Sequence, residues 1–294
     1  MDDLKTWLKT KQKEVDSALG GFLPRENASP RTIHKAMRYS IFAGGKRLRP
    51  ILCLAAAEAC GGETQHALAP ACATEVMHTY SLVHDDLPCM DDDDLRRGRP
   101  TSHKVFGEGM AVLTGDALLT EVFTIIAQTP ATKRYGVKDY VEEIATTGGS
   151  KKLIGGQVLD LEGEGKKLTK KDLIKIHEAK TAALLTASVR LGAMTANATP
   201  RKLEALTTFG YNLGLAFQVI DDILDVTQTT EMLGKTAGKD EAVDKSTYPA
   251  ILGLEASRKE AARLTKKSLK ALEVFGEKGK RLEQIARYLL EREY

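Results

Sequence analysis

Two groups of carboxylates are the residues of this sequence whose types and spacing could do chemistry. The stretch Asp85–Asp94 holds six acids within ten residues and is followed at once by Arg96-Arg97, and a second group, Asp221-Asp222-Ile-Leu-Asp225, lies far downstream. Close carboxylates repel one another, so a compact face cannot keep all of them ionised without counter-charge. An acidic run is often only a solvated surface. Carboxylate oxygens are also the ligands that hard cations such as Mg²⁺ prefer, so two such groups predict bound metal.

The second group has the spacing of one helical face. Its polar residues follow i, i+3, i+4, i+7 and share a stripe: Gln218, Asp221, Asp222 and Asp225. A separate apolar stripe runs about 120° around the wheel at 100° per residue and contains Leu213, Phe217, Ile220 and Leu224. This pattern predicts a helix with one face in the core and one acidic face at a site.

The first group fits a helix only in part. His78, Ser81 and Asp85 share a stripe at i, i+3, i+7. Asp91 lies six residues after Asp85 and off that face, and Pro88 interrupts the helical pattern. Asp91 can return to the site only through a bulge or loop that starts near Pro88.

Basic residues accompany both acidic groups. Gly44–Pro50 places Lys46, Arg47 and Arg49 after a glycine turn, and further basic positions are Arg96, Arg97, Lys180, Lys235, Lys239 and Lys245. Arginine is suited to bidentate contacts with phosphate. Singly, each would be read as a surface charge, but together with the carboxylates they indicate a site for metal and diphosphate. The sequence lacks the Gly-x-x-x-x-Gly-Lys-Ser/Thr pattern, which disfavours a P-loop nucleotide enzyme.

The bulk composition excludes several functional classes. Of 294 residues, 42% are hydrophobic and 28% charged, and 43 basic residues against 40 acidic ones leave a formal net charge of +3. This balance argues against a nucleic-acid partner. No signal peptide or run of 18 apolar residues is found, so we expect no membrane span and a cytoplasmic protein. Four cysteines lack metal-ligand spacing and are expected to be reduced: Cys53, Cys60, Cys72 and Cys89.

The elements that must position these residues are helices. The periodic segments are 3–19 (ended by Gly20-Gly21), about 30–42, 50–60, 65–86, 110–128, 138–161, 172–197, 200–227, 247–272 and 278–291. Convincing alternating strands are absent, so the sequence predicts one all-α domain over residues 1–294. The unpatterned segments 88–104 and 228–246 each follow an acidic group, as mobile lids over an active site would.

With these motifs the sequence resembles the trans-isoprenyl diphosphate synthases. Asp85-Asp86-x-x-x-x-Asp91 followed by Arg96-Arg97-Gly98 is similar to the family's first aspartate-rich motif in its form with two inserted residues, and Asp221-Asp222-x-x-Asp225 to the second. Further matches follow in family order and cover nearly the whole chain: Gly44–Pro50, Gly155-Gly156-Gln157-Val-Leu-Asp160, Lys180-Thr181, Phe217-Gln218 and Leu233-Gly234-Lys235.

The resemblance implies a fold, a reaction and a role for each motif residue. The fold would be a helical bundle around a deep central cavity, usually homodimeric. The reaction would be Mg²⁺-assisted ionisation of an allylic diphosphate and head-to-tail attack by isopentenyl diphosphate. Asp85, Asp91 and Asp221 would bind Mg²⁺, with three ions expected and Mn²⁺ as an alternative, supported by Asp86, Asp222 and Asp225. Isopentenyl diphosphate would contact Lys46, Arg49, His78 and Arg97. The allylic diphosphate would contact Arg96, Lys180, Thr181, Gln218, Lys235 and Lys245, and of these Arg96, Lys180 and Lys235 would also serve catalysis with Asp85 and Asp221.

Product length would depend on Tyr80 and Ser81, because the family's chain-length residue lies five positions before the first aspartate. Tyr80 together with Pro88 is similar to the bacterial farnesyl diphosphate synthases, so the resemblance favours a C15 product. A C20 (geranylgeranyl) synthase is the alternative, since it shares every catalytic residue. A class I terpene cyclase and a non-catalytic regulatory subunit are less favoured, because both aspartate motifs and the basic Gly44–Pro50 turn are intact.

Overall fold

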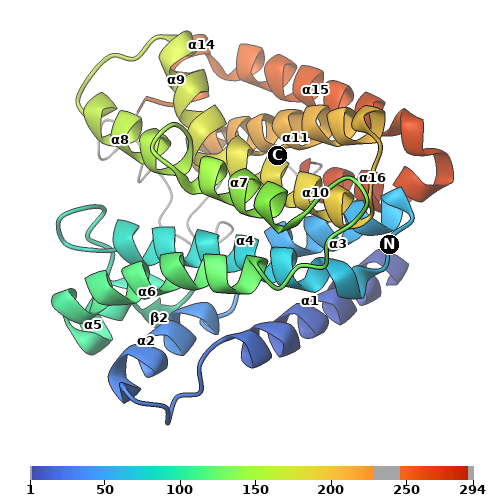
Figure 1. Ribbon diagram of the computed structural model, residues 1–294. Helices are drawn as coiled ribbons and strands as arrows, with labels where there is room; N and C mark the ends of the chain where they lie inside the picture. The colour runs from blue at the N-terminus through green and yellow to red at the C-terminus, as the bar shows by residue number, and fades with distance from the viewer. Residues whose placement is uncertain (1, 228–245, 291–294) are drawn as a thin grey trace.

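Helices make up most of the computed structural model, which describes residues 2–227 and 246–290. Figure 1 shows them as α1 (Asp2–Phe22), α2 (Arg31–Ile41), α3 (Leu48–Cys60), α4 (Thr64–Asp85), α5 (Ser102–Phe106), α6 (Glu108–Ile126), α7 (Val137–Gly148), α8 (Leu153–Gly163), α9 (Lys170–His177), the π-helix η1 (Glu178–Ala182), α10 (Ala183–Thr195), α11 (Pro200–Thr227), α14 (Tyr248–Leu252), α15 (Leu254–Ala271), the 3₁₀ helix η2 (Leu272–Gly279) and α16 (Lys280–Leu290). The predicted all-α fold class is confirmed.

The helices pack around two apolar clusters. In Figure 1, α4 and α6 lie along each other in the lower half, α11 and α15 in the upper half, and α3 and α10 connect the two halves. One cluster draws on α3, α10, α11, α15 and α16, and the other on α1, α3, α4, α6 and α10. Small residues bring α3 and α10 close, because a Cβ on Gly192 would overlap the carbonyl of Cys53. The assignment of the whole chain to one domain stays a prediction.

Several predicted helix boundaries were wrong. Gly20 and Gly21 do not end α1, which continues to Phe22, since neither glycine has a positive φ. The predicted helix 138–161 is two helices, α7 and α8, and the predicted helix 172–197 is α9, η1 and α10. The predicted helix 247–272 divides at Gly253, whose φ of +81° is a left-handed value that favours glycine.

The segment predicted to be an unpatterned loop after the first acidic group has structure of its own. Leu95–Arg96 (β1) pairs antiparallel with Arg99–Pro100 (β2), in a two-residue hairpin, and α5 begins at Ser102. The other predicted lid, 228–246, lies outside the described residues except for Ser246.

One described helix is long and apolar enough to be tested as a membrane span. α6 has a mean hydropathy of 1.5 over its best window, and 39% of that window is buried. Core helices of globular proteins give the same values, and α6 packs along α4. This measure alone therefore does not identify a span.

Candidate active site

A cavity of about 690 Å³ lies between α4, α8, η1 and α11. Its polar and charged lining residues are Arg49, His78, Ser81, His84, Asp85, Arg96, Gln157, Lys180, Thr181, Gln218 and Asp221. Its apolar residues are mainly Leu82, Leu87, Met90, Val112, Leu153, Ile154, Val158, Leu161 and Phe217, with Tyr80 among them. The cavity thus joins both acidic groups to a hydrocarbon-like surface, as the sequence predicted.

The C-terminal end of α4 supplies the first acidic group. α4 ends at Asp85, and a compact turn follows in which the N–H of Asp91 donates to the carbonyl of Asp85 at 2.8 Å. The N–H of Asp92 donates to the carbonyl of Leu87 at 3.1 Å. The predicted loop near Pro88 is present, and its backbone returns Asp91 to Asp85. The exposed Asp91 side chain is not among the residues that line the cavity.

Burial sets the protonation of the acids in this turn. The pKa of Asp85 is raised to about 6 by loss of solvent, and the charge of Asp91 adds to the rise while Lys180 opposes it. Asp86 is buried and accepts a hydrogen bond from Arg96 Nε at 2.9 Å, and Arg96 also contacts Asp93 at 3.0 Å. Asp86 therefore holds Arg96 at the cavity wall.

The glycine turn before α3 brings the two basic motifs together. Gly44 and Gly45 have φ values of +97° and +119°, and the Arg97 guanidinium occupies the place of a Cβ on Gly45. Arg97 donates to the carbonyl of Gly44. Only glycine at position 45 leaves room for this contact.

Arg47 serves the fold and not the cavity. It is 2% exposed and bonds to Asp16 at 2.8 Å, to Glu75 at 2.9 Å and to the carbonyl of Ile41 at 2.7 Å. These bonds tie the start of α3 to α1, α4 and the end of α2.

Two predicted ligands of isopentenyl diphosphate line the cavity. Arg49 has a buried Nε with no hydrogen-bond partner, and loss of solvent lowers its pKa to about 10. The pKa of His78 lies well below its ordinary 6.5, because His78 is removed from solvent and stands near Arg49 and Arg97. His78 is therefore neutral at pH 7. Lys46 is exposed on the turn, and Arg97 lies on the hairpin beside it.

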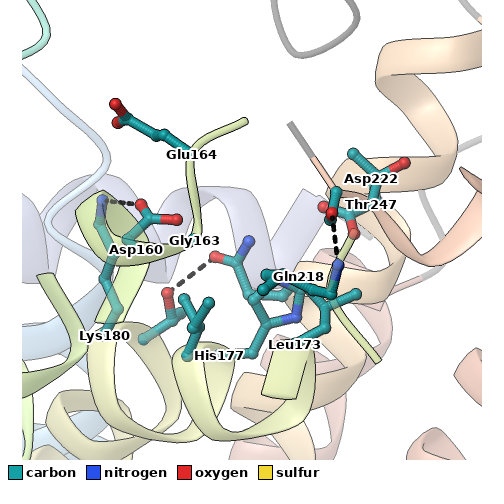
Figure 2. A pocket seen from close by; sticks show the side chains of 13 residues that line it. Asp160, Gly163, Glu164, Leu173, His177, Lys180, Gln218, Asp222 and Thr247 are labelled. Carbon is teal, nitrogen blue, oxygen red and sulfur yellow. Dashed lines mark hydrogen bonds and ion pairs between the residues drawn. The ribbon is translucent and has the colours of Figure 1, made fainter. Parts of the chain in front are cut away.

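Two predicted contacts lie where η1 meets α11. Thr181 Oγ1 donates to Gln218 Oε1 at 2.8 Å, and both residues line the cavity together with Asp221. Lys180 Nζ pairs with Asp160 on α8 at 2.7 Å. Figure 2 shows Lys180 and Asp160 pointing toward each other. Both residues line a side pocket of about 120 Å³, which Gln218 also lines.

The predicted polar stripe on α11 divides, which corrects the helical-wheel expectation. Asp221 lines the main cavity, but Asp222 and Asp225 are buried. Asp222 accepts the N–H of Tyr248 at the start of α14 at 2.9 Å. A buried carboxylate is stabilised by such a donor. Phe217, predicted as part of the core stripe, packs against the core and also lines the cavity.

The donor set of the cavity suits a metal–diphosphate group. The predicted ligands Asp85, Asp91 and Asp221 do not form a preformed cage, and Mg²⁺ commonly uses one or two carboxylates plus substrate phosphates. The orphaned Arg49 Nε is a donor suited to a phosphate oxygen. Among the described residues, one group of three does bring its ligand atoms within 4.8 Å of one another: Asp92, Asp94 and His103.

Some lining residues were not predicted. Ile154, Val158 and Leu161 on α8 follow i, i+4, i+7, a pattern that also describes a core face, so spacing alone does not predict that they line a cavity. His84 and Asp160 were not given roles, although Asp160 belongs to a recognised motif. Lys235 and Lys245 lie outside the described residues.

Fold and cavity define a class: an all-α bundle whose cavity combines carboxylates, cations and an apolar wall. Comparison with known proteins then specifies the family. A family model described as polyprenyl synthetase matches residues 30–288. The chain is 51% identical over 248 residues to a chloroplastic geranylgeranyl pyrophosphate synthase of Capsicum annuum, covering 84% of this chain and 67% of that one.

Solved structures agree with this assignment. A geranylgeranyl pyrophosphate synthetase from Pyrococcus horikoshii has a TM-score of 0.90 and 31% identity, covering 99% of both chains. A geranyltransferase from Helicobacter pylori, complexed with magnesium and isoprenyl diphosphate, has a TM-score of 0.82 and 33% identity, covering 97% of this chain and 96% of that one. The chain belongs to the polyprenyl synthetase family, that of the trans-isoprenyl diphosphate synthases. It is a prenyltransferase.

Proposed function

We propose that this enzyme condenses isopentenyl diphosphate head to tail with allylic diphosphates, in the presence of Mg²⁺. The observation that carries the proposal is the single cavity in which Asp85 and Asp221 meet Arg49, Arg96 and Lys180 beside an apolar wall. A prenyl diphosphate has the same two parts, an anionic head and a hydrocarbon chain.

The chain's own residues bind, orient and exclude water. Asp85, Asp91 and Asp221 would hold Mg²⁺, which supplies neutralisation of the charge that develops on the departing diphosphate. Arg96, Lys180 and Thr181 would surround that diphosphate, with Gln218 held against Thr181. Lys46, Arg49, His78 and Arg97 would hold the diphosphate of the second substrate, with His78 donating as a neutral ring. The metal ligands would be supported, through water or through hydrogen bonds, by Asp86, Asp222 and Asp225.

The reaction needs no side-chain nucleophile. Ionisation of the allylic C–O bond leaves a cation that the double bond of isopentenyl diphosphate attacks, and a proton then leaves to the released diphosphate. The apolar wall, including Phe217 and Val158, excludes water that would capture the cation.

For the main product we propose geranylgeranyl diphosphate, which replaces the farnesyl product favoured at first by Tyr80. The names of the Capsicum annuum relative and the Pyrococcus horikoshii structure support the C20 product. Farnesyl diphosphate is the second candidate, because Tyr80 is 4% exposed and its bulky ring lines the cavity.

We also propose a homodimer that pairs through α6. Leu113 on this helix is 55% exposed and is not among the cavity-lining residues, an unusual exposure for a large aliphatic side chain on a helix so rich in apolar residues. Light scattering of the purified protein should give twice the chain mass, and Leu113→Glu should return it to a monomer.

The compartment stays a prediction. The cytoplasm is expected from the sequence, whereas the name of the Capsicum annuum relative places that protein in the chloroplast. Fractionation of the source cells with an antibody to this chain separates the two compartments.

Product analysis tests the proposed reaction. The purified protein is incubated with dimethylallyl diphosphate, labelled isopentenyl diphosphate and Mg²⁺, and the dephosphorylated products are separated by chain length. We expect a C20 alcohol as the main product and no product after chelation of the metal. A main C15 product would establish the second candidate, and absence of any elongated product would refute the reaction.

A further inference from the structure

One wall of the cavity is built by residues that no recognised motif singles out. His84 on α4 and Val112 on α6 both line the cavity beside Tyr80. His84 comes four residues after Tyr80, so the two side chains lie on neighbouring turns of the same helical face. α4 and α6 pack along each other at this place.

Contacts on two sides fix the ring of His84. Its centroid lies 6.0 Å from that of Tyr80, with the ring planes at 86°, which is an edge-to-face contact. Its Nε2 lies 3.0 Å from the carbonyl oxygen of Val112 and donates to it, because a carbonyl can only accept. The same nitrogen is 3.9 Å from a carboxylate oxygen of Asp116.

Gly115 provides the space that the ring occupies. A Cβ built on Gly115 would fall on the imidazole ring of His84. Gly115 is a buried residue of α6 and has no positive φ. A glycine inside a helix costs about 1 kcal/mol relative to alanine, so the backbone conformation does not account for this one. The close approach of the His84 ring does.

We propose that His84, seated on Gly115, is a second chain-length-determining residue that sets the position of the Tyr80 ring. This inference rests on the proposed elongation reaction. The His84 ring packs on Tyr80 on one side and bonds to the Val112 carbonyl of α6 on the other, so it links the position of the Tyr80 ring to α6. A methyl group on Gly115 displaces the His84 ring toward Tyr80 and the cavity, which shortens the product. Removal of the ring frees Tyr80 to move back, which lengthens it.

Two alanine substitutions on the same helix give a matched test. Gly115→Ala adds a methyl group against His84, whereas Gly109→Ala on α6 adds it where no atom lies within 4 Å. Each variant is incubated with dimethylallyl diphosphate and labelled isopentenyl diphosphate, and the ratio of the main product to the product one unit shorter is measured. We expect this ratio to fall about tenfold in Gly115→Ala and to stay at the parent value in Gly109→Ala. The rate of the first condensation, to C10, should stay within about twofold in both.

A double variant separates this role from a general packing defect. In the His84→Ala background, Gly115→Ala has no ring to displace and should leave the product ratio unchanged. His84→Ala by itself should lengthen the product, and this arm decides the question if Gly115→Ala fails to fold. An unchanged product distribution in folded Gly115→Ala or in His84→Ala overturns the inference. A shift that persists in the double variant overturns it as well. A parent protein that makes no prenyl product would instead refute the proposed function.

Discussion

Removal of the Tyr80 side chain should lengthen the product by one isoprene unit. Tyr80→Ala deletes about seven heavy atoms beyond Cβ from the cavity wall, which is room for the five carbons of one further unit but not for the ten of two. Burial of five more carbons contributes about 4 kcal/mol at ~0.8 kcal/mol per carbon. Since 1.4 kcal/mol is a factor of ten, the partition between successive products could change by up to about a thousandfold.

The assay compares product length at equal consumption of isopentenyl diphosphate. Tyr288→Ala on α16 is the matched control, since Tyr288 is 45% exposed and does not line the cavity. Far-ultraviolet circular dichroism establishes that Tyr80→Ala is folded, because truncation of a side chain that is 4% exposed costs about 3 kcal/mol. A folded Tyr80→Ala protein with the parent's product length would refute the assignment of Tyr80 to the cavity limit.

Three further outcomes are expected. Asp85→Ala and Asp221→Ala should each lower turnover by orders of magnitude through loss of metal, and near-parent activity at saturating Mg²⁺ would contradict the ligand role of that residue. Arg47→Met leaves the buried carboxylate of Glu75 unpaired and should lower the free energy of unfolding, measured in urea, by about 3–5 kcal/mol; a loss below 1 kcal/mol would contradict this. The pKa of His78 is lowered in the folded chain, so below pH 6.5 the unfolded chain takes up a proton that the folded chain does not. The free energy of unfolding therefore decreases as the pH is lowered. Between pH 7.5 and pH 5.5 the free energy of unfolding of the parent should fall by about 1.4 kcal/mol more than that of His78→Asn. Asp85 is present in both proteins, so its titration cancels in this comparison. Equal losses would refute a neutral His78.

The long helices were predictable because their periodicity is local. The helix expected over 200–227 is α11 with the same bounds, and the expected 65–86 is α4 shifted by one residue. The interruptions within the predicted helices were not predictable, since they depend on contacts with residues that are distant in sequence. η1 interrupts the helix predicted over 172–197, and there Gly156 of α8 packs directly on the backbone of Lys180.

The residue types of the site were predictable from the sequence. Which of these residues face the cavity and which are buried was not. The spacing of Asp221 and Asp222 places both on one stripe, yet only Asp221 faces the main cavity. Asp222 accepts a hydrogen bond from the N–H of Tyr248, which is a donor at the start of a helix and has no partner within its own helix. A wheel drawn from α11 alone cannot contain this donor, which lies 26 residues downstream. His84 was missed for the same reason, because its significance depends on a glycine of α6.

The acids after α4 differ in how their charges are balanced, and this difference supports the proposed metal position. Arg96 neutralises Asp86 and Asp93, which lie on the hairpin side of the turn. Asp85 faces the cavity, where burial raises its pKa to about 6 and the returning Asp91 adds to the rise. Ionised Asp85 and Asp91 therefore repel each other where the turn returns beside the end of α4. The proposed Mg²⁺ between them would remove that repulsion and would also stabilise the turn at Pro88 that returns Asp91.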